Sequence, residues 1–139
     1  MRDEPLRTLL RLRRLALDEA RLTLAACLEH ETEAAARLRQ IERSIQEETG
    51  RASSLDGGDA TVETFALWLR RVRAEQEAAE HALLEAETRT TEARVVLGAS
   101  RQAVEAVEAE LERREVVGRL EETRREQRIL DEIGGRPGR

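Results

Sequence analysis

The side chains that could perform chemistry are few in this chain, which has two histidines, one cysteine and no tyrosine. The sequence contains no glycine-rich loop that could hold a phosphate and no arrangement of a cysteine with a histidine that would make a nucleophile. The nearest approach to a chemical site is His30 and His81 with Glu33, Glu77 and Glu85, a set that contains metal-ligand types. The sequence therefore predicts a protein that is not an enzyme and has no cofactor.

Composition indicates long helices rather than a thick globular core. Charged residues make up 38% and aromatic residues 1% of the 139 residues, and Ala, Glu, Leu and Arg dominate the chain. Such a composition is typical of long helices and coiled coils. Acidic and basic residues alternate along most of the chain, whose net charge is -5, so no persistent basic face exists and nucleic acid is not an expected partner.

The sequence also predicts a location. The single cysteine, Cys27, excludes an intramolecular disulfide and fits a reducing compartment. No apolar run approaches the ~20 residues that a membrane-spanning helix needs. The opening MRDEPLRT lacks the apolar core of a secretory signal. We therefore expect a cytoplasmic protein that does not insert into a membrane.

Breaker residues divide the chain into two helical segments. Three glycines and two serines lie in GRASSLDGGDAT, the only interior stretch with this composition, and Asp59 or Thr61 can cap the helix that follows. We predict a single hairpin over 1–139, with a helix at about 5–48, a bend at about 49–60, a helix at about 61–132 and a flexible tail at 134–139.

Mainly apolar and small residues recur every seven positions in both segments, in two rows three positions apart. The rows are Leu10, Leu17, Leu24, Glu31, Leu38 and Ile45 with Arg13, Ala20, Cys27, Ala34, Ile41 and Glu48 in the first segment, and Val62, Leu69, Gln76, Leu83, Thr90, Leu97, Val104 and Leu111 with Phe65, Val72, Ala79, Ala86, Ala93, Ser100, Val107 and Arg114 in the second. Bulky residues in one row and small ones in the other predict a narrow seam between close antiparallel helices.

The predicted fold is all-α: a long antiparallel two-helix coiled-coil hairpin. The helices would be roughly 65 Å and roughly 105 Å long at 1.5 Å per residue, so the second is expected to overhang the first at its C-terminal end. The overhang ends in RREQRILDE, followed by Ile133. Because Ile129, Leu130 and Ile133 would have no helix of this chain to pack against, we expect their partner to be another protein.

The positions of four side chains relative to the rows lead to separate expectations. Because His30 and His81 lie outside the rows, we expect exposed histidines, and a metal-binding helical protein built around them is the third hypothesis. Phe65 belongs to a row and is expected in the core. Trp68 lies beside the seam, where it either binds a partner or packs locally against the first helix. Cys27 lies in the seam and is expected to be a small buried filler.

A basic stripe marks the beginning of the first helix. Arg7, Arg11 and Arg14 recur at helical spacing, and no acidic residue lies between Glu4 and Asp18. Two interpretations remain open. The stripe is either a solvated face balanced by glutamates of the second helix or a contact with an acidic partner surface near the termini; the glutamates concerned are Glu105, Glu108 and Glu112.

The length, the layout and the ending together resemble a known family. A hairpin that opens like LRTLLRLRRLALDEARLTLA and ends in a charged helix reading RREQRILDE is similar to the FliJ family of flagellar export proteins, which is related to the stalk proteins of virulence type III secretion systems. The resemblance covers nearly the whole chain, and the ending is its most specific part. It implies a non-enzymatic stalk and adaptor of the flagellar type III export apparatus, with chemotaxis as the wider process.

The resemblance also implies partners: a hexameric flagellar export ATPase, the cytoplasmic domain of an export gate membrane protein, and export chaperones. The end with both termini would enter the ATPase ring and a surface near the bend would contact the gate, at the basal body on the inner membrane. The implied ring-facing residues are Arg7, Arg11, Arg14, Arg124, Arg125, Gln127, Arg128, Leu130 and Asp131. The implied gate-facing residues are Ile41, Ile45, Phe65, Trp68, Leu69 and Val72.

The alternative function is a generic dimerising coiled-coil scaffold unrelated to secretion. In that case a second copy of the chain would bury the overhang in a symmetric interface. A stable dimer in solution would favour this alternative over a monomeric rod.

Overall fold

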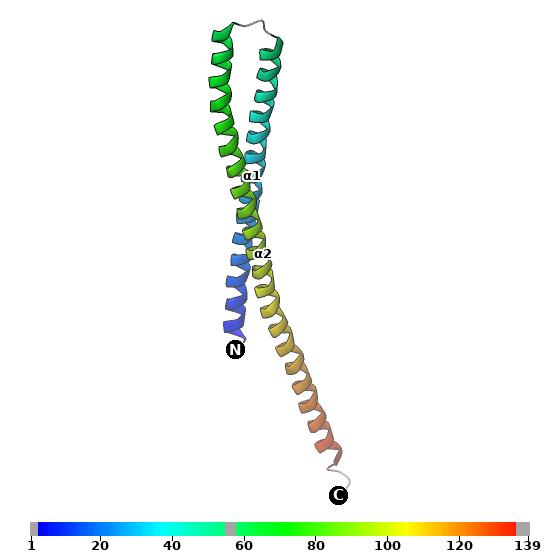
Figure 1. Cartoon of the computed structure of the whole chain (residues 1–139). Helices are drawn as coiled ribbons and strands as arrows, with labels where there is room; N and C mark the ends of the chain where they lie inside the picture. Colours follow the sequence, from blue (N-terminus) through cyan, green and yellow to red (C-terminus); the bar gives the residue numbers. More distant parts are fainter. Residues whose placement is uncertain (1–2, 55–57, 136–139) are drawn as a thin grey trace. The chain divides into compact units, whose positions relative to one another are not determined.

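Two long helices make up the computed structural model, which describes residues 3–54 and 58–135. Helix α1 comprises Glu4–Ser54, and helix α2 comprises Asp59–Gly135. The helices pack against each other as a hairpin, and no strand occurs among the described residues (Figure 1). The predicted all-α hairpin is therefore confirmed. No helix in the described part of the chain is both long and apolar enough to cross a membrane.

Both helices are longer than the sequence suggested near the bend. Helix α1 runs through Gly50 to Ser54, past the expected end at about 48. A single glycine costs a helix only about 1 kcal/mol, and Arg51 forms an ion pair with Glu48 one turn earlier. The hydroxyl of Ser53 donates a hydrogen bond of 2.8 Å to the carbonyl of Thr49, which fits serine inside a helix. Residues 49–54 and 59–60 of the expected bend are thus helical.

The two ends of α2 also differ from the expected bounds. The carbonyl oxygen of Gly58 accepts hydrogen bonds from the backbone N–H groups of Thr61, at 3.0 Å, and Val62, at 3.3 Å. This pattern makes Gly58 the residue that caps the helix, in place of the expected Asp59 or Thr61. At the other end, α2 continues through 134–135, where a tail was expected. Residues 136–139 of that tail and residues 55–57 of the bend lie outside the described residues.

The chain divides into two units, and each helix contributes to both. Unit 2, residues 19–97, has a small core in which Ile41, Ile45, Val72 and Ala79 are buried. Leu38, Trp68 and Leu69 pack against this core and are partly exposed. Thr90 is the most buried side chain, at 1% exposure, and its hydroxyl donates a hydrogen bond of 3.0 Å to the carbonyl of Ala86.

Unit 1 consists of residues 1–18 and 98–139. Its core is formed by Leu10 and Leu17 of α1 and Val104 and Val107 of α2, all of which are buried. Two ion pairs join the segments at their edges: Arg14 with Glu108, and Arg114 with Asp3, each at 3.4 Å between nitrogen and oxygen. Unit 1 is therefore a two-helix packing in which the last buried side chain of α2 is Val107 and the last half-buried one is Leu111.

Burial follows the rows that the sequence predicts. Within 3–54 and 58–135, all of the buried side chains belong to a row, namely Leu10, Leu17, Ala20, Ile41, Ile45, Val72, Ala79, Thr90, Ala93, Leu97, Val104 and Val107. Three row members are exposed instead: Arg13, Arg114 and Val62, the last at 62%. Val62 lies in the first turn of α2, where the packing between the helices begins.

Candidate functional site

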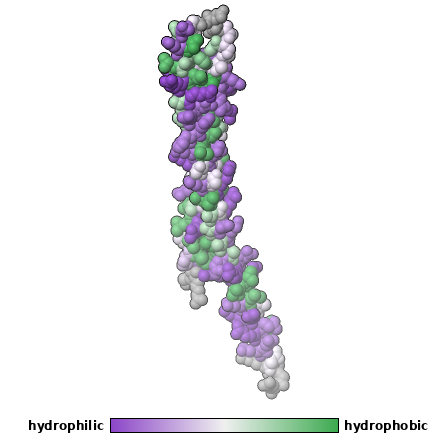
Figure 2. Space-filling model, in the orientation of Figure 1, coloured by the Kyte–Doolittle hydropathy of each residue, from purple (hydrophilic) through white to green (hydrophobic). Residues whose placement is uncertain are grey.

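Beyond Arg114, the end of α2 in unit 1 is helical but packs on nothing in the described chain. Every residue from 112 to 135 is exposed. Ile129, Leu130 and Ile133 are 50%, 62% and 59% exposed. A two-helix packing that ends near Arg114 leaves this segment as a single helix, which cannot bury its own apolar side chains. In the space-filling view, one apolar patch lies between polar surfaces along this part of the chain (Figure 2).

Apart from Arg114, which pairs with Asp3, the polar side chains of this segment make local contacts among the described residues. The side-chain amide of Gln127 donates a hydrogen bond of 3.4 Å to the carboxylate of Asp131. The Nε of Arg128 donates one of 3.4 Å to the carbonyl of Arg124. Arg124 and Arg125 are also exposed. These contacts orient the side chains along the helix and leave their outer surfaces accessible to a partner.

A second exposed apolar group lies in the same segment and was not identified from the sequence. Val116, Val117 and Leu120 are 42%, 47% and 53% exposed. These residues lie beyond Arg114, where the seam pattern fails, and they belong to neither row. A usable signal was present, because the spacing of Val116, Val117 and Leu120 is repeated by Ile129, Leu130 and Ile133.

The basic stripe at the start of α1 divides between the two interpretations. Arg14 pairs with Glu108 of α2 and so belongs to the balanced, solvated face. Both partners of that pair are about half exposed, so the pair contributes little to stability. Arg7 and Arg11 are exposed side chains of α1. The stripe therefore includes one arginine that is balanced by α2 and two that extend toward solvent.

A groove lies between the helices in unit 2, close to the bend. This bend groove has a volume of about 520 Å³ and is lined by Glu48, Arg51, Ala52, Ala60, Thr61, Thr64, Phe65 and Trp68. The rings of Phe65 and Trp68 stack with centroids 5.8 Å apart and an interplanar angle of 27°. Such a stacked pair gives the groove a rigid apolar wall, while the ion pair of Glu48 and Arg51 supplies a polar edge.

Trp68 takes part in both of the roles that the sequence left open. Its side chain packs against the core of unit 2, which is the local role. It also lines the bend groove and a smaller pocket of about 230 Å³ beside Ile41 and Val72. The indole of Trp68 is thus held by contacts with the core and also borders two open spaces, as a binding residue requires.

The gate-facing candidates fall into two groups by exposure. Ile41, Ile45 and Val72 are buried at 5%, 8% and 7% exposure and belong to the core of unit 2. Leu69 is half-buried against the same core. Phe65 and Trp68, in contrast, line an open groove. Of the six candidates, these two aromatic residues are the ones that line the bend groove.

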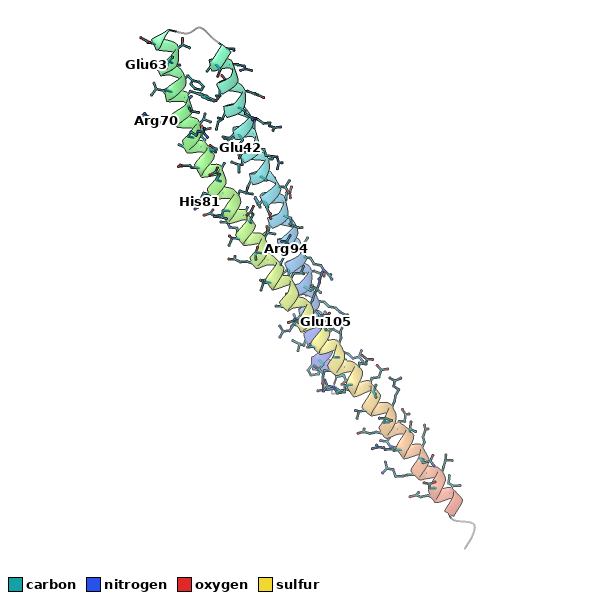
Figure 3. All side chains as sticks on the ribbon, turned by 45° about the vertical axis from the view of Figure 1, so that its right-hand side comes forward. Glu42, Glu63, Arg70, His81, Arg94 and Glu105 are labelled. Carbon is teal, nitrogen blue, oxygen red and sulfur yellow. The ribbon has the colours of Figure 1, made fainter. Side chains whose placement is uncertain are left out.

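Both histidines are exposed side chains of unit 2. Nδ1 of His30 is 4.0 Å from a carboxylate oxygen of Glu33, and Nδ1 of His81 is 3.6 Å from one of Glu85. His81 is on the outer side of α2 (Figure 3). In the described residues, no group of three or more His, Cys, Asp or Glu side chains could hold a metal ion. Cys27 is a free thiol of intermediate burial in the seam.

Comparison with known proteins relates nearly the whole chain to one family. A family model described as FliJ, the flagellar FliJ protein, matches residues 1–137. No curated protein and no solved structure matches the chain. The family match covers both helices, the bend groove and the exposed end of α2.

Proposed function

The chain belongs to the FliJ family of flagellar proteins, and from this premise we propose that it is the stalk of the export apparatus, with its exposed end inside the ring of the export ATPase. The family is a non-catalytic component of flagellar export. The match over residues 1–137 carries the proposal, because it includes the helix end from 112 to 135 that this chain leaves uncovered.

The exposed end of α2 supports contact with a ring. Leu130 and its apolar neighbours are accessible, and burial of one leucine side chain contributes about 1.5–3 kcal/mol. Arg124, Arg125, Gln127, Arg128 and Asp131 surround them with mixed charge. Exposed pairs of this kind contribute about 0–1 kcal/mol each and weaken with salt. The contact would then combine a few apolar anchors with many weak polar ones, which suits a stalk that must move in its ring.

The start of α1 adds to the same surface of unit 1. Arg7 and Arg11 are exposed on a stretch of helix without acidic residues, and Arg14 is held by Glu108. Long-range attraction between this stretch and acidic side chains of the ATPase would speed their association more than it strengthens the complex. These arginines therefore guide the stalk, and the apolar residues of α2 hold it.

The bend groove is the proposed contact for the export gate. Phe65 and Trp68 provide a stacked aromatic wall, and aromatic residues are enriched among the side chains that dominate binding energy. Leu69 and the buried Ile41, Ile45 and Val72 hold that wall in place. The partner would be the cytoplasmic domain of the gate protein, at the basal body on the inner membrane. Export chaperones are proposed as further partners of the same stalk.

The test of the ring contact is a truncation. The cognate flagellar export ATPase is assayed for ATP hydrolysis with the full chain and with a chain that lacks residues 124–139. We expect the full chain to stimulate hydrolysis and the truncated chain not to. Because no residue from 112 to 135 is buried, the truncated hairpin should retain its thermal unfolding midpoint. Normal stimulation by the truncated chain would refute the placement of this end in the ring.

The test of the gate contact uses two matched variants. Trp68→Ala should weaken binding to the cytoplasmic domain of the gate protein by about tenfold or more, as expected for an aromatic anchor. Leu67→Ala, one position away and 65% exposed, should leave the affinity unchanged. Titration calorimetry measures both. Equal affinities of the two variants would remove the bend groove from the gate interface.

A further inference from the structure

The exposed end of α2 carries two apolar patches of the same form. The first patch is Val116, Val117 and Leu120, and the second patch is Ile129, Leu130 and Ile133. Each residue of the second patch lies thirteen positions after its counterpart in the first patch: 129 follows 116, 130 follows 117 and 133 follows 120. All six side chains are between 42% and 62% exposed. The two patches are thus copies of one arrangement on one continuous helix.

The interval between the patches determines where they point. In an α-helix each residue turns by about 100° and rises about 1.5 Å, so a shift of thirteen residues moves a patch about 20 Å along the axis and turns it by about 140°. The first and second patches therefore face nearly opposite sides of the helix, at two different levels. No single face of this segment is apolar along its length.

This geometry argues against a second copy of the chain as the partner. A helix in a two-stranded coiled coil covers one narrow stripe that repeats every 3.5 residues. Even at that period, a shift of thirteen residues leaves the patches about 100° apart. A second helix lying along α2 would cover one patch and leave the other in water. A partner that covers both must reach around the helix.

The residues between the patches do not favour one sign of charge. Glu121, Glu122 and Glu126 are matched in number by Arg124, Arg125 and Arg128. A neutral band has no net attraction for an acidic or a basic surface, so specificity would come from the apolar patches above and below it. The partner then needs two apolar contact zones separated by a polar one.

We propose that the partner encircles the end of α2 and grips it at two levels, with different subunits covering the first and second patches. This inference rests on the proposed function and adds to it, because it requires two apolar layers in the pore of the ATPase ring, about 20 Å apart. The first patch, near Arg114, meets one layer, and the second patch, near Gly135, meets the other. Both layers contribute independently to binding.

The test compares three leucine variants. Leu120→Gln alters the first patch, and Leu130→Gln alters the second patch. Leu84→Gln is the control, because Leu84 lies in unit 2 and is 62% exposed, the same as Leu130. The concentration of chain that gives half-maximal stimulation of the ATPase is measured for each. We expect a rise of about tenfold for either patch variant and about a hundredfold for the double variant, because distant sites add. The control should match the wild-type chain.

Cross-linking identifies the subunits. A photo-reactive side chain is placed at position 120, at position 130, and at both. Each single label should join the chain to an ATPase subunit, and the double label should yield a product with two ATPase subunits. A loss of stimulation confined to one patch variant, or a double label that captures one subunit, would overturn the encircling partner.

The two proposals fail in different ways. If the wild-type chain neither stimulates nor cross-links to the ATPase, the proposed function is refuted and the inference with it. If the wild-type chain stimulates but only one of Leu120→Gln and Leu130→Gln weakens it, the stalk function stands and the two-level grip is wrong. A stable dimer that both variants dissociate would assign the patches to a second copy, against the inference.

Discussion

Helix α2 has one part that packs within unit 2 and another part, in unit 1, that packs on no described residue. The two parts differ in the pattern of their apolar residues. From 69 to 97, buried and half-buried residues follow two rows on one face. From 112 to 135, the apolar residues change direction between one patch and the next, and all are exposed. A constant direction suits one neighbouring helix. In this helix, periodicity therefore distinguishes the packed part from the exposed part.

The largest expected effect separates the core of unit 2 from the exposed end. Ile41→Ala should lower the free energy of unfolding by about 2–4 kcal/mol, because it leaves a cavity under Trp68 and Leu69. Leu130→Ala should change it by less than about 0.5 kcal/mol, since Leu130 is 62% exposed. Urea denaturation followed by circular dichroism measures both. A large loss with Leu130→Ala would show that the end of α2 is packed in the free protein.

A smaller effect should separate two adjacent threonines of the same helix. Thr90 and Thr91 each donate a hydrogen bond of 3.0 Å to the carbonyl four residues earlier, but Thr90 is 1% exposed and Thr91 is exposed. Thr90→Leu should destabilise by about 1–3 kcal/mol, because the close seam has no space for a larger side chain. Thr91→Leu should be nearly neutral in the same denaturation measurement. Similar losses at both positions would contradict the narrow seam.

The exposed end should gain stability from a glycine substitution. A Cβ added to Gly118 meets no atom within 4 Å. Gly118→Ala should therefore stabilise the helix by about 1 kcal/mol through its higher helix propensity. The expected readout is slower amide hydrogen exchange from 112 to 135, with no change in unit 2. Faster exchange would mean that the helix end depends on the glycine, against its description as a single unpacked helix.

The smallest effect concerns the ion pair of Arg14 with Glu108 in unit 1. Its side chains are 58% and 48% exposed, so a double-mutant cycle with Arg14→Gln and Glu108→Gln should give a coupling below about 1 kcal/mol. High salt should abolish that coupling. A larger coupling that persists in salt would mean that the pair, and not the apolar seam, holds the start of α1 to α2.

Heptad spacing predicted the hairpin and its seam because burial of apolar surface provides most of the free energy that drives helix pairing. Ile41, Ile45, Val72 and Thr90 all lie where the rows put them. The bend was predicted less well. Gly50 belongs to a stretch rich in breaker residues, yet α1 continues through it to Ser54 with local hydrogen bonds. Propensity is a weak guide where neighbouring residues can offset about 1 kcal/mol.

The candidate site was predictable only in part. The family resemblance implied Leu130 and its charged neighbours, and the structure shows them exposed. Neither the resemblance nor the rows pointed to Val116, Val117 and Leu120. The rows follow one face of the helix, and these three residues lie outside that face. Nor could spacing show that Ile45 is buried while Phe65 lines a groove, since both belong to the rows. That difference depends on how the two helices meet near the bend.

Trp68 has a practical consequence. It is the only tryptophan of a chain that has no tyrosine, so all of the protein's long-wavelength ultraviolet fluorescence comes from the wall of the bend groove. Its emission therefore reports on the polarity of that groove and of the smaller pocket beside it. A ligand or protein that entered either space would change this emission in the unlabelled native chain. No other tryptophan or tyrosine would contribute to the signal.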